Sequence, residues 1–194
     1  MGREFEVKFG LTEDQASQLL AYLNTEACGT LHMQTTYYDT KDSALSARHI
    51  TLRKRMENGS PVCTVKTPIS GFGRGEWETG CDDITAAVPE LVRLGAPKEV
   101  EELAKPGLVP ICGARFTRIY RTISCCEAQI ELALDRGVLT GGNREAPLLE
   151  FEMELKSGTE GNALAAAEAF RLHYGLTAEP LSKFRRALAL ARGE

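Results

Sequence analysis

Charged side chains recur at every second position in several short stretches of this chain, and this alternation limits what it can fold into. Residues 4–9 read E-F-E-V-K-F, so that Glu4, Glu6 and Lys8 alternate with apolar side chains. A period of two is typical of a β-strand, whose successive side chains point to opposite faces. One such strand has an ordinary interpretation, in which its polar face meets bulk water.

The same alternation returns elsewhere in the chain. Glu76 and Glu78 flank Trp77, Arg53 and Arg55 flank Lys54, Thr64 and Lys66 flank Val65, Glu131 and Asp135 share one parity, and Glu150, Glu152 and Glu154 alternate with Phe151 and Met153. A solvated sheet face rarely needs so many long charged side chains at matching positions. We therefore predict an α+β fold, in which a closed eight-stranded antiparallel β-barrel encloses a charged interior and helices lie outside and at the ends.

Length and composition are those of a single globular domain, residues 1–194. The chain is 43% hydrophobic and 26% charged, and its net charge of −4 argues against a nucleic-acid or membrane-surface partner. No apolar run approaches the roughly 20 residues that span a bilayer. The strand pattern at Glu4 has no secretory signal before it, and the six cysteines contain no paired CxxC motif. We therefore expect a cytoplasmic protein with reduced thiols.

Hydrophobic periodicity and turn residues outline the elements. We expect helices from Thr12 to about Leu23, over 84–105 with a break at Gly95-Ala96-Pro97, and over 159–174 and 181–192, with a short helical turn over 42–47. We expect strands over 31–39, 49–56, 61–66, 76–80, 109–123, 126–135, 138–140 and 148–156. Asn58-Gly59 marks a hairpin turn, and Gly71–Gly75 a loop.

The acidic and basic sets suggest complementary roles. Crowded carboxylates are costly unless a cation neutralises them, and carboxylate oxygen suits Mg²⁺ or Mn²⁺. Arginine and lysine side chains suit phosphate oxygens. The acidic set is Glu4, Glu6, Glu150, Glu152 and Glu154; the basic set is Lys8, Arg53, Arg55, Lys66, Arg121 and Lys183, with Arg74, Arg118, Arg185 and Arg186 as further candidates. Together the two sets indicate a site for a polyphosphate with a divalent metal.

Each motif alone has a plainer explanation. Residues 4–8 could form a solvated edge strand, and Arg53 and Arg55 a surface ladder paired with neighbouring acids. No GKS or GKT follows the Gly71–Gly75 loop, which favours a hairpin over a phosphate loop. The three histidines show no ligand spacing, and no serine or cysteine lies in a nucleophile motif. Water is therefore the expected attacking group.

The ordered set of motifs resembles the CYTH superfamily, also called triphosphate tunnel metalloenzymes. The resemblance covers nearly the whole chain and is strongest to the bacterial inorganic triphosphatase branch. It rests on the ExExK start, Tyr37-Tyr38-Asp39, Leu52-Arg53-Lys54-Arg55, Thr64-Val65-Lys66, Glu76-x-Glu78, Tyr120-Arg121, residues 131–137, Glu150-x-Glu152-x-Glu154 and Leu181-Ser182-Lys183.

This resemblance implies a tunnel that binds a triphosphate end-on, with Mg²⁺ or Mn²⁺ held by glutamates. It also suggests a partner within a longer natural chain, because bacterial relatives often carry a helical CHAD domain after the tunnel. By motif, the catalytic set would be Glu4, Glu6, Lys8, Glu76, Glu78 and Asp135, the metal ligands Glu4, Glu6, Glu150, Glu152 and Glu154, and the substrate-binding set Lys8, Arg53, Arg55, Lys66, Arg121, Lys183 and Arg186, with Glu131 also lining the tunnel.

The main functional hypothesis is metal-dependent hydrolysis of inorganic triphosphate to pyrophosphate and phosphate. A nucleoside or thiamine triphosphatase and an adenylyl cyclase are alternatives with the same fold, and they need a pocket for an organic group that no motif identifies. A non-catalytic polyphosphate-binding module is an alternative of another class. Such a module needs the basic residues but gains little from five glutamates.

Overall fold

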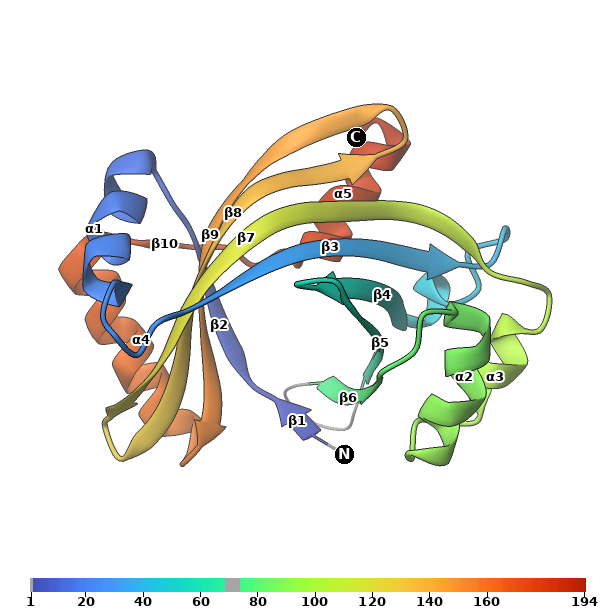
Figure 1. Ribbon diagram of the computed structural model, residues 1–194, viewed down its shortest axis with the longest axis horizontal. Coiled ribbons are helices and arrows are strands. Elements are labelled where there is room, and N and C mark those ends of the chain that lie inside the picture. Colours follow the sequence, from blue (N-terminus) through green and yellow to red (C-terminus); the bar gives the residue numbers. More distant parts are fainter. Residues whose placement is uncertain (1, 69–73) are drawn as a thin grey trace.

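The computed structural model describes residues 2–68 and 74–194, with side chains described from Phe5 onward. Within these residues, ten strands form one antiparallel sheet (Figure 1). The strands are β1 (Gly2–Glu4), β2 (Glu6–Gly10), β3 (Gly29–Asp39), β4 (Thr51–Glu57), β5 (Ser60–Pro68), β6 (Arg74–Thr79), β7 (Val109–Cys125), β8 (Ala128–Gly141), β9 (Arg144–Ser157) and β10 (Thr177–Ala178). The helices are α1 (Glu13–Leu23), α2 (Ile84–Arg93), α3 (Glu99–Ala104), α4 (Glu160–Tyr174) and α5 (Lys183–Arg192), with a 3₁₀ turn at Ser46–Arg48.

Among the described residues the sheet is curled but is not closed by hydrogen bonds, and it has ten strands. The prediction of a closed eight-stranded barrel is therefore wrong in both closure and strand number. The strand order is β1-β6-β5-β4-β3-β7-β8-β9-β2-β10. Only Phe5 separates β1 from β2 in the chain, yet β1 pairs with β6 and β2 pairs with β9. The chain therefore crosses from one side of the curled sheet to the other at Phe5. In a closed barrel, a ladder of hydrogen bonds would join the two sides instead.

Several element predictions hold and others change. The helical block over 84–105 is split into α2 and α3 as predicted. The predicted separate strand at 138–140 is instead part of β8, which runs unbroken from Ala128 to Gly141. Cys126 lies in the turn before that strand rather than in it. Of the predicted glycine-rich loop, 71–73 lie outside the described residues, while Arg74 begins β6.

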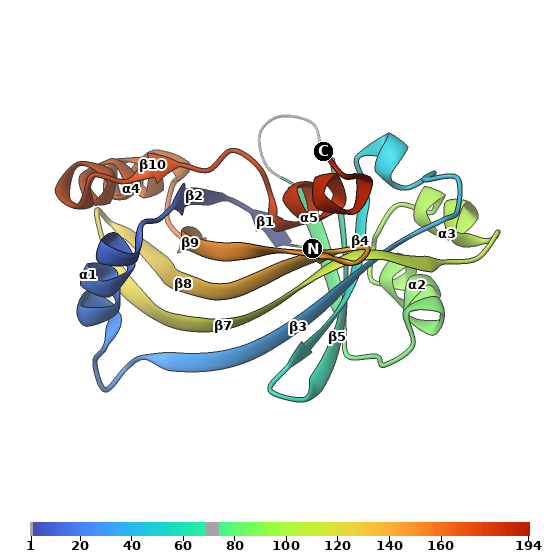
Figure 2. The same ribbon diagram turned by 90° about the horizontal axis from the view of Figure 1, so that it is seen from above.

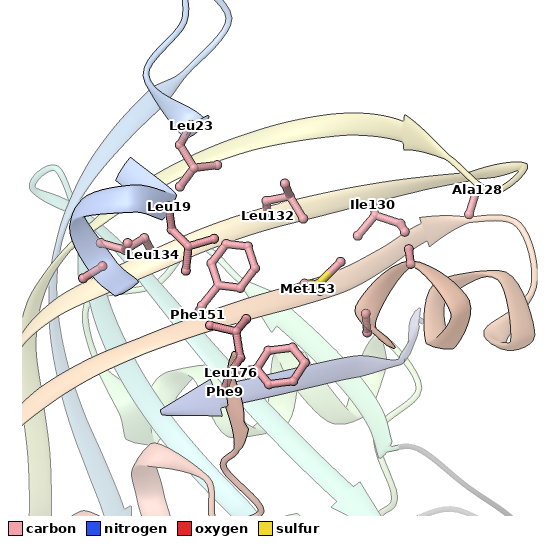
Figure 3. Close-up of a cluster of buried hydrophobic side chains, with 13 residues drawn as sticks. Phe9, Leu19, Leu23, Ala128, Ile130, Leu132, Leu134, Phe151, Met153 and Leu176 are labelled. Atoms are coloured by element: carbon pink, nitrogen blue, oxygen red, sulfur yellow. The ribbon is translucent and has the colours of Figure 1, made fainter. Parts of the chain in front are cut away.

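The main hydrophobic core lies on the outer face of the sheet, beneath α1 and α4 (Figure 3). Phe151 and Met153 of β9 alternate with the charged positions of that strand and point outward into this cluster. Leu19 and Leu23 of α1 cover them from above, and both are fully buried. α1 begins with the predicted capping box, in which Thr12 and Gln15 bond each other's backbone amides. The outward, apolar face of these strands is thus buried under α1 and α4.

Two further clusters attach the remaining helices. α2 and α3 lie at the opposite end of the sheet from α1 and α4, over β4, β5 and β6 (Figures 1 and 2). α5 packs instead on Leu139 of β8 and Leu148 of β9, which share parity with the charged residues Asp135 and Glu150. A Cβ at Gly141 would lie 2.4 Å from the backbone nitrogen of Ala191, so this approach requires glycine. α5 therefore lies on the concave side of the sheet.

Asp39, the last residue of the Tyr-Tyr-Asp motif, has a structural role. Its carboxylate is 1% exposed and accepts hydrogen bonds from the backbone amides of Thr40 (2.7 Å), Leu45 (2.9 Å) and Ser46 (3.0 Å). A buried carboxylate is tolerated when donors surround it in this way. The motif thus fixes the loop that leads into β4.

Among the described helices, none has both the length and the apolar character that a membrane span requires.

Candidate functional site

The concave side of the sheet encloses a charged cavity of about 590 Å³. Strands β2 to β9 contribute to its walls, and residues at the start of α5 complete it. Of the described residues, nine basic and seven acidic side chains line it: Lys8, Arg53, Arg55, Lys66, Arg74, Arg118, Lys156, Lys183 and Arg185, and Glu6, Glu57, Glu76, Glu78, Glu131, Glu152 and Glu154. Charge of both signs converges here because the strands present it at every second position.

The basic wall is formed by β4 and β5. Arg53 faces Lys66 across Glu76, whose carboxylate lies 3.5 Å from the arginine and 3.3 Å from the lysine. Burial and the neighbouring Arg53 lower the pKa of Arg55, even though Glu57 pairs with it. Burial is the larger of these two causes, and the charge of Arg53 adds like-charge repulsion to it. Such a wall would be stabilised by a bound anion.

The acidic wall is formed by β2, β9 and β8. Glu6 is the cross-strand partner of Glu154, and Glu154 is that of Glu131, so three carboxylates form one row across the strands. Lys156 partly neutralises this row, at 2.9 Å from Glu154 and 3.5 Å from Glu131. Lys8 lies 3.0 Å from Glu6, and although burial opposes it, this contact raises the pKa of the lysine.

Deeper in the structure, Asp135, Glu150 and Glu152 bring their oxygens within 4.8 Å of one another. Lys183, the first residue of α5, contacts all three: its Nζ lies 2.7 Å from Asp135 and 2.8 Å from Glu152, and it also pairs with Glu150. Arg118 forms a two-pronged contact with Asp135, at 2.8 and 2.7 Å, and pairs with Glu152. The cluster is thus a buried, internally neutralised network.

The members of this network differ in their affinity for protons. Burial raises the pKa of Glu150 to about 7, against the opposing effect of Lys183. Burial opposes ionisation of Glu152 as well, but Lys183 and Arg118 hold its pKa well below the usual range. Burial would lower the pKa of Lys183, and the surrounding carboxylates raise it instead. Glu152 is therefore the stronger acid of the two glutamates, and Lys183 stays protonated at neutral pH.

Most of the predicted site residues are brought together. Glu6, Lys8, Arg53, Arg55, Lys66, Glu76, Glu78, Glu131, Glu152, Glu154 and Lys183 all line the cavity. Asp135, Glu150 and Arg186 lie behind its wall, where Arg186 pairs with Glu150 and lies 3.4 Å from Glu179. The backbone of Glu4 belongs to β1, but its side chain lies outside the described part of the chain. Its roles in catalysis and metal binding therefore stay predictions.

Arg121 is the predicted residue that the structure places elsewhere, and its assignment to the cavity is corrected. Its guanidinium lies 4.6 Å from the ring centre of Tyr22 in α1 and bonds the Thr25 hydroxyl at 3.3 Å, on the outer face. Arg121 pairs with Leu132 across the ladder, whereas Arg118 pairs with Asp135. The Tyr-Arg motif pointed to Arg121, but strand parity selects Arg118.

Some lining residues were absent from the predicted set. Arg118 and Arg74 were only further candidates, and Lys156 was not considered. A usable signal existed for Arg118: a two-residue hairpin pairs even-numbered positions of β7 with odd-numbered positions of β8, and thus with the predicted Asp135. Lys156 continues the parity of Glu152 and Glu154 by one more step. Arg74 shares the parity of Glu76 and Glu78 on β6, so the same alternation would have placed it on the inner face.

The donors on the acidic wall fit a hard divalent ion. Such ions take carboxylate oxygens, and each carboxylate offers about four lone-pair positions. Glu6, Glu152 and Glu154 line the cavity and keep this capacity beside their lysine and arginine partners. Glu150 is fully buried between Lys183 and Arg186 and does not open onto the cavity. The accessible carboxylates therefore suit a metal better than Glu150 does.

The chain resembles known proteins in both sequence and structure. The model of the CYTH domain family matches residues 2–188. The chain is also 28% identical, over 197 aligned residues, to an inorganic triphosphatase from Haemophilus influenzae. That alignment covers 98% of this chain and 55% of the relative, so the chain spans about half the length of that protein.

Solved structures with the same fold include a putative adenylyl cyclase from Hippeastrum, described as having a dominant triphosphatase activity. It shares 19% identity at a TM-score of 0.69, over 99% of this chain and 96% of that one. A putative adenylate cyclase from Bacillus halodurans shares 18% identity at a TM-score of 0.65, over 94% and 96%. At these identities the likeness concerns the fold.

The network around Lys183 predicts a strong effect on stability. Replacing Lys183 with methionine leaves three neighbouring carboxylates without their shared cation, which costs about 3–5 kcal/mol for a buried pair. Urea denaturation should therefore show a large drop in the free energy of unfolding. Lys105→Met removes an exposed lysine paired with Glu102 and should leave the unfolding curve unchanged. Equal curves for the two variants would contradict the role given to Lys183.

Proposed function

Because this chain belongs to the CYTH domain family, we propose that it hydrolyses inorganic triphosphate to pyrophosphate and phosphate in the charged cavity, with Mg²⁺ or Mn²⁺. The observation that carries the proposal is the division of one cavity into a basic wall, with Arg53, Arg55 and Lys66, and an acidic wall, with Glu6 and Glu154. A linear triphosphate needs both, since its oxygens require cations from the protein and its metal requires carboxylates. The triphosphatase named among the relatives supports the same substrate class.

The basic wall binds and orients the substrate. Arg53 and Arg55 offer planar donor groups to phosphate oxygens, and Lys66 adds a compact charge. Glu76 pairs with Arg53 and Lys66. Glu78 lies 3.7 Å from Arg53 and is itself held by a hydrogen bond from the Thr64 hydroxyl at 2.9 Å. They are therefore positioning residues in this proposal. Crowded cations held in place in advance need no rearrangement when charge develops on the leaving pyrophosphate.

The acidic wall faces the reacting end of the substrate. Glu6, Glu152 and Glu154 would hold the divalent ion, which when bound neutralises phosphate oxygens and increases the acidity of water. A carboxylate of the row Glu6–Glu154–Glu131 orients the attacking water by accepting its hydrogen bond. The bond from the terminal phosphorus to the bridging oxygen breaks and its electron pair leaves with pyrophosphate. The water oxygen becomes part of phosphate, and the proton that the water loses passes to the carboxylate that orients it.

Lys183 and Arg118 connect the two walls. Both are tied to Glu152 and Asp135 and also line the cavity, so each can donate to a phosphate while it fixes the acidic wall. Ser182 caps α5 and, with Lys183, faces the cavity, so the positive end of the helix dipole points toward the substrate. In this proposal Asp135 and Glu150 hold the cations in place and do not bind the metal.

Phosphate release tests the activity directly. Purified protein with Mg²⁺ or Mn²⁺ should release phosphate from triphosphate, and removal of the metal with EDTA should stop the reaction. Glu6→Gln should lower kcat by about 100-fold or more, because a charge that stabilises the transition state is lost. Lys98→Ala, an exposed site outside the cavity, is the control and should keep full rate.

The same assay separates the alternatives. A preference for thiamine triphosphate or ATP over inorganic triphosphate would replace the proposed substrate, and cyclic AMP formation from ATP would indicate a cyclase. Metal-independent binding without hydrolysis would indicate a binding module. Any of these results would contradict the proposal as stated.

A pair of arginine variants tests the division between the inner and outer faces. Arg55→Ala removes a charged donor from the basic wall and should raise KM by about 10-fold or more, since hydrogen bonds to charged groups contribute about 1.5–3 kcal/mol. Arg121→Ala removes an arginine that contacts Tyr22 and should leave KM within about two-fold of wild type, since this residue does not line the cavity. Steady-state kinetics with triphosphate measures both. A larger effect from Arg121→Ala would return that residue to the site.

A further inference from the structure

Two adjacent cysteines lie at the hairpin that joins β7 to β8. Cys125 pairs with Ala128 across the ladder, so Cys126 and Glu127 form a two-residue turn. Both turn residues have positive φ, 52° and 58°. Neighbouring side chains of an extended strand point to opposite faces, but this left-handed turn brings the Sγ atoms of the two cysteines to 3.4 Å from each other. The turn therefore places the two thiols close enough to bind the same metal or metalloid atom.

The turn is an unusual place for these residues. Two-residue hairpins with positive φ at both positions strongly prefer Asn-Gly or similar sequences. A residue other than glycine that is held in this backbone conformation costs of order 1–3 kcal/mol of stability. The cysteine pair is thus held in its convergent geometry by the long β7–β8 ladder, which continues for 13 paired positions below the turn.

The pair is also accessible. Cys126 is exposed and Cys125 is partly buried, and both line a hollow of about 270 Å³ with Ser124, Gln129 and Ser157 among its walls. The Gln129 side chain donates to the Ser124 hydroxyl at 2.7 Å and braces the hollow. None of the residues around this hollow lines the charged cavity. A ligand here would not compete with the substrate for the same groups.

The buried cysteines offer no comparable site. Burial raises the pKa of Cys63 to about 11 and that of Cys112 to about 12, so both remain protonated thiols at neutral pH. Thiolates are the form that reacts and binds metals. The contact with Cys126 raises the pKa of Cys125 as well, so the hairpin pair is favoured over these two by its exposure and by the short distance between its sulfurs.

We propose that Cys125 and Cys126 form a dithiol site for thiophilic trivalent metalloids, of which monosubstituted arsenicals are the chemical class. Soft sulfur ligands select soft centres. In the reaction two arsenic–sulfur bonds form and the arsenic–oxygen bond of an arsenoxide breaks. The two thiol protons leave with that oxygen as one water molecule, and no atom changes oxidation state. A structural zinc site would need four ligands, whereas a monosubstituted arsenical needs the two sulfurs that the hairpin supplies.

Phenylarsine oxide is the probe for this site. The reduced full-length chain should take up one phenylarsenic group by intact mass spectrometry and lose two titratable thiols, and an added small dithiol should remove the group. Cys125→Ser and Cys126→Ser should each weaken binding by about 100-fold or more, because the second bond to the same protein is lost. Cys28→Ser is the matched control and should bind as wild type does.

Two results would overturn the proposal. One is a wild-type chain that forms no adduct. The other is an adduct of unchanged affinity on Cys126→Ser, which would place the arsenical on other thiols. Cys126 is exposed in a turn, so the circular dichroism of this variant should match wild type. Triphosphate hydrolysis does not enter the measurement, so this proposal and the proposed function can fail separately.

Discussion

The structure depends on the neutralisation of carboxylates that lie on the inner face of its sheet. Asp135 and Glu150 are fully buried, and isolated charges in such positions would cost several kcal/mol each. Lys183 contacts both of them and also Glu152, while Arg118 bridges Asp135 and Glu152. Because Lys183 is the first residue of α5, the position of this helix and the neutralisation of the buried carboxylates depend on each other. The site is therefore part of what holds the fold together.

This arrangement reverses the usual distribution of residues in a curled sheet. Much of the inner face carries charge, so the apolar residues of the same strands point outward, where α1 and α4 bury one group and α2 and α3 another. Two of the three hydrophobic clusters are thus buried on the outer face, and the third lies under α5 on the concave side. The interior is left free to hold water and a polyanion. A cavity with fixed charges of both signs is stable without its ligand because the two signs pair with each other.

Much of this could be predicted from the alternation of residues alone. The parity of Glu6, Lys8, Arg53 and Lys66 placed them correctly on one inner face, because a strand has only two faces. The break at Phe5 could not be predicted, since the residues 4–8 show one unbroken pattern while their backbone changes partner strand. The position of α5 on the concave side could not be predicted either, because it depends on contacts with residues of β8 and β9 that are distant in the sequence. The Tyr-Arg motif assigned Arg121 to the cavity. Its pairing with Leu132 of β8 places it on the outer face instead.

The central claim is that a triphosphate lies between the two walls with its metal on the acidic side. A crystal structure with Mn²⁺ and a non-hydrolysable triphosphate analogue, with anomalous scattering to locate the metal, tests it most directly. The account predicts a manganese peak beside Glu6, Glu152 and Glu154 and phosphate oxygens on Arg53, Arg55 and Lys66. A metal bound between Asp135 and Glu150 after displacement of Lys183, or an analogue bound outside the cavity, would contradict it.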